Sequence, residues 1–242
     1  MKIIFLGTGA SGGTPGTDKS LRLESSLLIK NKLNILIDVT RNFVEQSKKI
    51  DKTDDILLTH GHQDACGGIN QLRSWWQSKN LPPIPVFAHR KVITRIQKKF
   101  KQLDHCKFIE IKDHQSFNLG QSKITACQVP HTKDKNFPTF AWKIQDQKIV
   151  IYASDIAIPT TKFKNFCKDA NLLIIDGATW KRKIFTHLRI DQDLPKICQW
   201  PVNKIILTQI GKSVPPHEKF TMEVAKICPK AIPAYDGIVI PL

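Results

Sequence analysis

Two histidines and an aspartate alternate along one short segment of the chain, at His60, His62 and Asp64. Imidazole nitrogen and carboxylate oxygen are common zinc ligands, and a histidine nitrogen lies about 2.0–2.1 Å from the ion. The segment follows residues 55–59, a short apolar run typical of a buried strand, so we expect these side chains on a loop at the strand's end. Loops of this kind often carry function. The pattern therefore predicts a metal site.

Polar residues follow later apolar runs in the same way, at His131, Asp155, His187 and Gln209. Three histidines and one aspartate would complete a tetrahedral or slightly expanded zinc shell. Because the pattern recurs along the chain, the metal-site prediction does not depend on the first segment alone.

The chain has 242 residues, of which 41% are hydrophobic, and we expect a single domain over residues 1–242. No stretch approaches the roughly 18 apolar residues of a transmembrane helix. The apolar N-terminal run is too short for a signal peptide, so we expect a cytoplasmic protein with no membrane partner. The cysteines form no CxxC pair, and reduced thiols are expected in place of a disulfide framework.

The net charge of the chain is +16, from 37 lysines and arginines against 21 aspartates and glutamates. Such a surface concentrates phosphate-bearing ligands around it, although a lysine-rich composition alone gives the same charge. Basic residues gather at residues 90–101 and 181–183. Trp180, beside the second group, is expected to pack in the core but could contact a base. Nucleic acid is therefore open as a partner.

Alternating apolar runs and turn residues predict the strands and helices that position these side chains. A glycine-rich loop at residues 7–16 ends the first strand. The mixed order favours two sheets with helices packed outside. The predicted strands span residues 2–6, 25–29, 33–37, 55–59, 85–88, 106–111, 124–129, 139–144, 148–153, 172–176, 204–208 and 238–240, and the predicted helices span 40–49, 68–79, 92–102, 190–199 and 216–227.

In the order and spacing of its motifs the chain resembles the metallo-β-lactamase superfamily, within it the branch of tRNase Z and the phosphonate-operon cyclic phosphodiesterase. The resemblance covers essentially the whole length. It implies an α/β (α+β) fold, a four-layer αββα sandwich of two mixed sheets with outer helices and the site at one edge of the sheets. The motifs are residues 5–13, Leu36-Ile37-Asp38, His60-x-His62-x-Asp64, His131, Ser154-Asp155 and Ala234-Tyr235-Asp236-Gly237.

The resemblance implies that His60, His62 and His131 hold a first zinc ion, with Asp155 bridging toward a second. All four of these residues are present. The first metal site is therefore expected to be complete.

The second metal site implied by the resemblance has lost ligands. Asp64 is present, but Ala65 and Gln209 stand where such enzymes carry histidines. A methyl group cannot bind a metal, and an amide oxygen is a poor zinc donor. We expect one zinc, with a second zinc, manganese or magnesium ion weak or absent; Cys66 is a further donor only if its thiolate turns into the site.

The expected activity is that of a metallo-hydrolase. A single zinc can lower the pKa of its bound water to about 7 and so supply hydroxide near neutral pH. Asp64 would act as general base. By resemblance, His187 is the general acid toward the leaving group. His217 is a lesser candidate for substrate binding, because anions are favoured near a helix N-terminus. The most specific prediction is a phosphodiesterase of a small nucleotide-like or cyclic phosphate ester, because no insertion resembles the arm with which many tRNase Z enzymes grip tRNA.

Two other functions stay open. One is a non-catalytic, degenerate member that binds a ligand or nucleic acid, as the substituted positions Ala65 and Gln209 suggest. The other is a relative in cofactor biosynthesis, like the lactamase-like protein of the pyrroloquinoline quinone pathway. A different ester, a thioester or a lactone also fits, since one fold hosts many chemistries. Dimers occur in this branch, so the resemblance allows a homodimer.

Overall fold

The computed structural model describes residues 1–134 and 136–242, and their strands form two sheets of seven strands each. The first has the order β14-β1-β2-β3-β4-β5-β6, with β1 (Lys2–Gly7), β2 (Ser26–Lys30), β3 (Asn34–Ile37), β4 (Asp55–Leu57), β5 (Ile84–Ala88), β6 (Cys106–Glu110) and β14 (Val239–Pro241). The second has the order β13-β12-β11-β10-β9-β8-β7, with β7 (Ser116–Leu119), β8 (Ser122–Val129), β9 (Thr139–Gln145), β10 (Ile149–Ala153), β11 (Ala170–Asp176), β12 (Val202–Thr208) and β13 (Ala231–Pro233).

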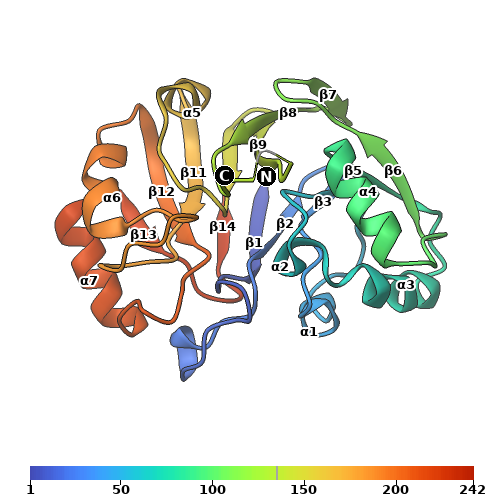
Figure 1. Ribbon diagram of the computed structural model, residues 1–242, viewed down its shortest axis with the longest axis horizontal. Helices are drawn as coiled ribbons and strands as arrows, with labels where there is room; N and C mark the ends of the chain where they lie inside the picture. The colour runs from blue at the N-terminus through green and yellow to red at the C-terminus, as the bar shows by residue number, and fades with distance from the viewer. Residues whose placement is uncertain (135) are drawn as a thin grey trace.

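Helices cover the outer faces of both sheets. The helices are α1 (Phe43–Ser47), α2 (Gln63–Cys66), α3 (Ile69–Ser78), α4 (Arg90–Lys99), α5 (Thr161–Phe166), α6 (Ile190–Cys198) and α7 (His217–Ile227), with one 3-10 turn at Asp18–Ser20. In Figure 1, α6 and α7 lie at the left and α1 to α4 at the right, with strands β1, β12 and β14 among those between them. The predicted four-layer αββα sandwich is therefore confirmed. No helix in the described part of the chain is long and apolar enough to cross a bilayer.

Both sheets are mixed, as predicted. Strands β1, β2 and β3 pair antiparallel, and β3 to β6 continue in parallel. In the second sheet β7 to β10 pair antiparallel and β10 to β13 in parallel. The chain's two ends meet on the first sheet, where β1 pairs with β14 and the amino group of Met1 donates to the carbonyl of Leu242 at 2.9 Å.

Three apolar clusters hold the layers together. The central one lies between the two sheets and contains the fully buried Phe5, Trp142 and Tyr152. A second cluster packs the first sheet against α3 and α4, and a third packs the second sheet against α5, α6 and α7. Burial of each large apolar side chain contributes about 1.5–3 kcal/mol. The sandwich is thus a rigid support for loops at its edge.

The structure differs from the predicted elements in short segments. The predicted strand at 124–129 begins at Ser122 and pairs with an additional strand, β7. Gly120 makes the turn between them with a φ of 57°, a left-handed conformation that favours glycine. Helices α2 and α5 span 4 and 6 residues, which is too little for a helical period to show in the sequence. The predicted helix at 40–49 shortens to α1.

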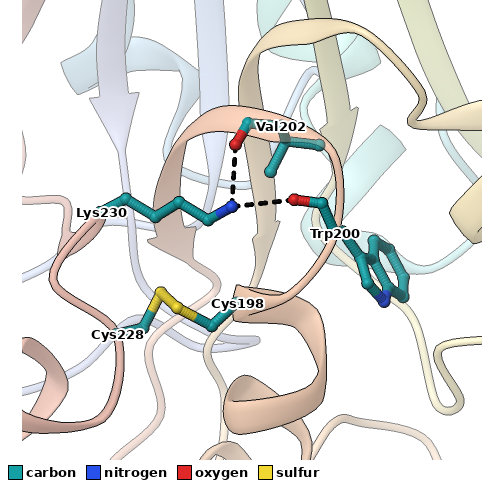
Figure 2. The surroundings of a disulfide bond; sticks show 5 residues. All are labelled: Cys198, Trp200, Val202, Cys228 and Lys230. Carbon is teal, nitrogen blue, oxygen red and sulfur yellow. Dashed lines mark hydrogen bonds between the residues drawn. A yellow bond between two sulfur atoms is a disulfide. The ribbon is translucent and has the colours of Figure 1, made fainter.

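Two of the six cysteines form a disulfide, so the expectation of reduced thiols is wrong for Cys198 and Cys228. The bond joins the last residue of α6 to the residue that caps α7 (Figure 2). Beside it, Lys230 donates to the backbone carbonyls of Trp200 and Val202, at 2.8 and 2.9 Å. This corner of the fold is held by a covalent bond and by an ammonium group together.

Cys198→Ser is expected to lower the free energy of unfolding by about 3–4 kcal/mol in the absence of reductant, because the cross-link restricts the unfolded chain. Urea denaturation measures it, with Cys106→Ser, a free and half-buried cysteine, as the matched control. Reductant should bring the wild type to the value of the variant. Equal free energies for oxidised wild type and Cys198→Ser would contradict the assignment.

Candidate metal centre

The predicted site residues converge at one edge of the two sheets. Strands β8, β10, β11 and β12 run in the same direction, so their carboxyl ends meet there. His131, Asp155 and Gln209 follow three of these strands. The loop after β4 brings the His-x-His-x-Asp segment from the first sheet, and a hydrogen bond of 2.8 Å from the amide of Phe140 to the carbonyl of Thr59 joins the sheets at this point.

His60, His62 and His131 face one another, with their ligand atoms all within 4.8 Å. Nε2 of His131 lies 3.3 Å from Nδ1 of His62. Burial, aided by the neighbouring imidazoles, lowers the pKa of His60 to about 3 and that of His62 to about 4. Both rings are therefore neutral near pH 7, and neutral imidazole is the form that binds metals.

Surrounding groups hold two of these rings by the nitrogen that points away from the cluster. The hydroxyl of Thr59 donates to Asp38 at 2.8 Å and lies 2.9 Å from Nδ1 of His60, from which it can accept. Nδ1 of His131 donates to the carbonyl of Thr186 at 2.9 Å. Nε2 of His60 is buried and has no hydrogen-bond partner among residues 1–134 and 136–242. A ring fixed through one nitrogen, with the other directed into a cluster, fits a metal ligand.

Two carboxylates complete the cluster, and Gln209 connects them. Nε2 of His60 lies 3.8 Å from Oδ1 of Asp64 and 4.0 Å from Oδ1 of Asp155. The amide nitrogen of Gln209 donates to Oδ2 of Asp64 and to Oδ1 of Asp155, each at 3.1 Å. The amide thus lies between the two carboxylates, Asp64 and Asp155. The donor set fits one metal ion at the histidines, whereas a neutral donor already bridges the two acids.

The two residues that follow Asp64, Ala65 and Cys66, are buried in the protein interior. Ala65 is 1% exposed and carries no donor atom. The thiol of Cys66 donates to the carbonyl of His62 at 3.2 Å, and its side chain packs in the apolar cluster beneath α3 and α4. Burial raises the pKa of the Cys66 thiol to about 12. Cys66 is therefore a core residue here, and it is absent from the described clusters of metal-binding side chains.

The pKa values of the two carboxylates move in opposite directions. Burial and the nearby charge of Asp155 raise the pKa of Asp64 to about 7. Burial opposes the charge of Asp155 too, but the surrounding histidines, among them the charged His187, and a hydrogen bond from the Ser154 hydroxyl outweigh it and hold its pKa well below the usual range. Of the pair, Asp64 is the carboxylate that exchanges a proton near neutral pH.

His187 reaches the cluster from the second sheet, and its ligand atom lies within 4.8 Å of those of His131 and Asp155. Nδ1 of His187 lies 2.6 Å from Oδ2 of Asp176, which is fully buried. Burial lowers the pKa of His187, but the Asp176 carboxylate and its hydrogen bond outweigh this effect and raise it to about 9. His187 is consequently charged at neutral pH.

Asp176 is the functional residue that the sequence analysis missed. It ends β11, at the same edge of the sheet as His131, Asp155 and Gln209. The sequence did contain a signal for Asp176, because it ends an apolar strand run just as His131, Asp155 and Gln209 follow the other strands of this edge. The pairing with His187 depends on a loop that returns to the edge, which the sequence does not reveal.

The structure separates His217 from the other predicted residues. Its Nδ1 lies 3.0 Å from a guanidinium nitrogen of Arg22, and its ring packs at 5.5 Å against Tyr235. His217 belongs to none of the described clusters that contain His60 or His131. Its role in substrate binding stays a prediction, without a contact to the metal centre.

Comparison with known proteins agrees with this architecture. A model of the beta-lactamase superfamily domain matches residues 33–208. A crystal structure of a diphosphatase from the PhnP family has a TM-score of 0.85 and 22% identity, covering 99% of this chain and 97% of that one. Zinc-bound PqqB from Methylobacterium extorquens has a TM-score of 0.85 and 16% identity, covering 100% of both chains.

An octanoyltransferase from Porphyromonas gingivalis (strain ATCC BAA-308 / W83) is 26% identical over 263 residues. The match covers 98% of this chain and 51% of that protein, so the chain spans about half the length of this curated relative. Three observations point to the same family: the match over residues 33–208, the two-sheet sandwich and the histidine cluster at its edge. The chain belongs to the beta-lactamase superfamily.

Proposed function

We propose that this protein is a one-metal hydrolase of phosphodiesters, with zinc held by His60, His62 and His131. The observation that carries the proposal is a pair of proton-exchanging groups beside the histidine cluster: the carboxylate of Asp64 and the charged imidazole of His187. A zinc ion held by these three histidines would supply a Lewis acid and would lower the pKa of a bound water to about 7. The side chains of the protein then supply orientation and proton transfer.

Asp64 is proposed as the general base. Its Oδ2 is fixed by the amide of Gln209, while its Oδ1 is buried without a hydrogen-bond partner among the described residues and lies 3.8 Å from Nε2 of His60. A base works best when its pKa is near the working pH, and burial together with Asp155 raises the pKa of Asp64 to about 7. It is thereby suited to accept the proton of an attacking water.

His187 is proposed as the general acid. Asp176 holds the Nδ1 side of the ring, which directs Nε2 toward His131 and Asp155. Because the pKa of His187 is raised to about 9, the ring carries a proton at neutral pH that it can give to a leaving alkoxide.

A phosphate ester is the favoured substrate. The likeness to the PhnP-family diphosphatase supports this choice, as does a net charge of +16, which attracts anionic esters. The second candidate is hydrolysis of an acyl ester or thioester, which the match to an octanoyltransferase favours. Turnover of bis(p-nitrophenyl) phosphate and of p-nitrophenyl octanoate, measured side by side, separates the two.

The purified protein reconstituted with zinc is expected to bind about one ion per chain. The double variant Ala65→His/Gln209→His should bind about two, because it adds two imidazole ligands and removes the bridging amide. Elemental analysis measures both, and Gln209→Ala, which removes the amide alone, is the control. If the double variant binds no more zinc than the wild type, the second site has lost its geometry. No zinc in the wild type would refute the hydrolase and favour a non-catalytic binding protein.

Asp64→Asn is expected to lower kcat for bis(p-nitrophenyl) phosphate by about 10²–10⁴-fold, the usual contribution of a general base. Zinc content should stay near that of the wild type, because the three histidines remain. The control is Glu45→Gln, which removes an exposed carboxylate on α1. Unchanged turnover would exclude Asp64 as the base.

His187→Ala is expected to impair substrates unequally. An alkyl leaving group needs a proton, whereas p-nitrophenolate departs without one, so cleavage of a methyl p-nitrophenyl diester should fall much less than cleavage of a dialkyl diester. Rates for both substrates in His187→Ala, and in the exposed control His114→Ala, test this role. An equal loss for both leaving groups would rule out proton donation by His187.

A further inference from the structure

A cavity of about 430 Å³ lies between the glycine-rich loop after β1 and the segment that joins β12 to α7. Residues 14–17, Ser20 and Arg22 line it on one side, and residues 210–212 and 214–216 line it on the other. None of the residues in the described metal-binding clusters belongs to this lining. The cavity is therefore separate from the metal centre, and we call it the Arg22 cavity.

Arg22 brings a positive charge to the wall of this cavity, although its side chain is only 3% exposed. The guanidinium donates to the hydroxyl of Thr8 at 2.8 Å and to the backbone carbonyl of Ala234, and its Nη2 lies 3.0 Å from Nδ1 of His217. Burial, aided by the charges of Arg22 and Lys19, lowers the pKa of His217 to about 4, so its ring is neutral near pH 7. All three of these hydrogen-bond partners are therefore uncharged.

One acid reaches Arg22 only through a hydroxyl group. Asp236 accepts a hydrogen bond of 2.7 Å from the same Thr8 hydroxyl to which Arg22 donates. Its charge does not compensate for the burial of the guanidinium, because burial lowers the pKa of Arg22 more than Asp236 raises it, to about 10. Arg22 still carries its charge at neutral pH. A buried cation in this state is stabilised by an anion that binds beside it.

Further donors converge on the same cavity. A guanidinium has five N–H groups, and the hydrogen bonds of Arg22 leave two of them without a partner in the described chain. Ser20 accepts from the backbone amide of His217 at 2.9 Å, so its own hydroxyl proton remains to donate to a ligand. Lys212 adds an exposed ammonium group to the lining. Pro216, also in the lining, is the N-cap of α7 and makes no side-chain cap, and such a helix N-terminus favours an anion.

The shape and lining of the cavity suit an organic acid better than a bare ion. Small-molecule sites have volumes of about 300–1,000 Å³, and the volume of this cavity lies within that range. Pro15, Val214 and Pro215 supply apolar surface, and the described lining contains no aspartate or glutamate. A planar guanidinium matches the two oxygens of a carboxylate. The lining thus combines a carboxylate-binding group with apolar walls.

We propose that the Arg22 cavity binds a small carboxylic acid, with its carboxylate at Arg22 and Lys212 and its apolar body against Pro15 and Pro215. The sequence pointed to the N-terminus of α7 as an anion site through His217, and the buried arginine beside that ring is the residue that carries the charge. The proposal goes beyond the proposed function, because binding in this cavity requires neither a metal ion nor hydrolysis.

Titration of the ¹⁵N-labelled, metal-free protein, followed by NMR, tests the cavity with benzoate, benzamide and inorganic phosphate. Benzoate should shift the amide signals of residues 210–212 and bind about tenfold or more tightly than benzamide, which has a similar shape but no charge. It should also bind more tightly than phosphate, which has charge but no apolar body. Equal affinities for benzoate and benzamide would overturn the proposal, as would unshifted amides or a phosphate affinity that matches that of benzoate.

Variants locate the bound carboxylate. Lys212→Glu should lower the affinity for benzoate by about tenfold or more, because it places a like charge beside the ligand. Lys123→Glu makes the same charge change at an exposed position of β8 and should bind benzoate like the wild type. Arg22→Met should abolish the preference for benzoate over benzamide, and Lys212→Glu carries the test if circular dichroism shows that Arg22→Met does not fold. Unchanged affinity in Lys212→Glu would contradict the site.

The zinc-loaded protein provides a second control, because no residue of the histidine cluster lines the Arg22 cavity. Zinc-loaded and metal-free protein should bind benzoate with equal affinity. Competition between zinc and benzoate would place the acid at the histidines and overturn the proposal. Because benzoate binding is measured without turnover, the site stands or falls independently of the proposed hydrolase.

Discussion

Two buried carboxylates, one from each sheet, lie close together at the shared edge of the sheets, and their arrangement depends on the group between them. Asp64 comes from the loop after β4, while Asp155 and Gln209 follow strands of the second sheet. Buried like charges are costly unless they are hydrogen-bonded. The Gln209 amide donates to both at 3.1 Å, and its own backbone amide donates to Ser25 at 2.8 Å. One neutral side chain therefore joins the edges of both sheets and leaves the histidine cluster intact.

The side chains around the histidine cluster differ in the protonation state that their surroundings favour. A second metal ion would hold both acids ionised, whereas an amide contributes no charge. Burial and the charge of Asp155 raise the pKa of Asp64 although the hydrogen bond from Gln209 lowers it, while the surrounding histidines, the charged His187 among them, hold the pKa of Asp155 low. On the other side Asp176, fully buried, keeps His187 protonated. The same burial that favours neutral imidazoles at His60 and His62 thus favours a neutralised acid at Asp64, and only a direct ion pair reverses it at His187.

Much of this arrangement could be predicted from the sequence, because it depends on local order. Strand runs that end on polar residues predicted the sandwich and the convergence of His60, His62, His131 and Asp155. The bonds that fix their orientation could not be predicted, since they join distant segments: Thr186 to His131, and Gln209 to Asp64. Burial and charge set the pKa of His187, and neither is visible in residue spacing. The structure places His217 beside Arg22 and outside the histidine cluster, so its role in substrate binding stays a prediction.

The Cys198–Cys228 disulfide also constrains a segment of chain that contributes to the metal centre. The loop of chain that it closes includes β12, Gln209 and α7. Proteins open in cooperative units smaller than the whole, and a covalent clasp around one unit makes its opening rarer. The amide that bridges the two acids is carried on that unit. Because the disulfide closes the segment that carries Gln209, we expect it to make local opening of that segment rarer.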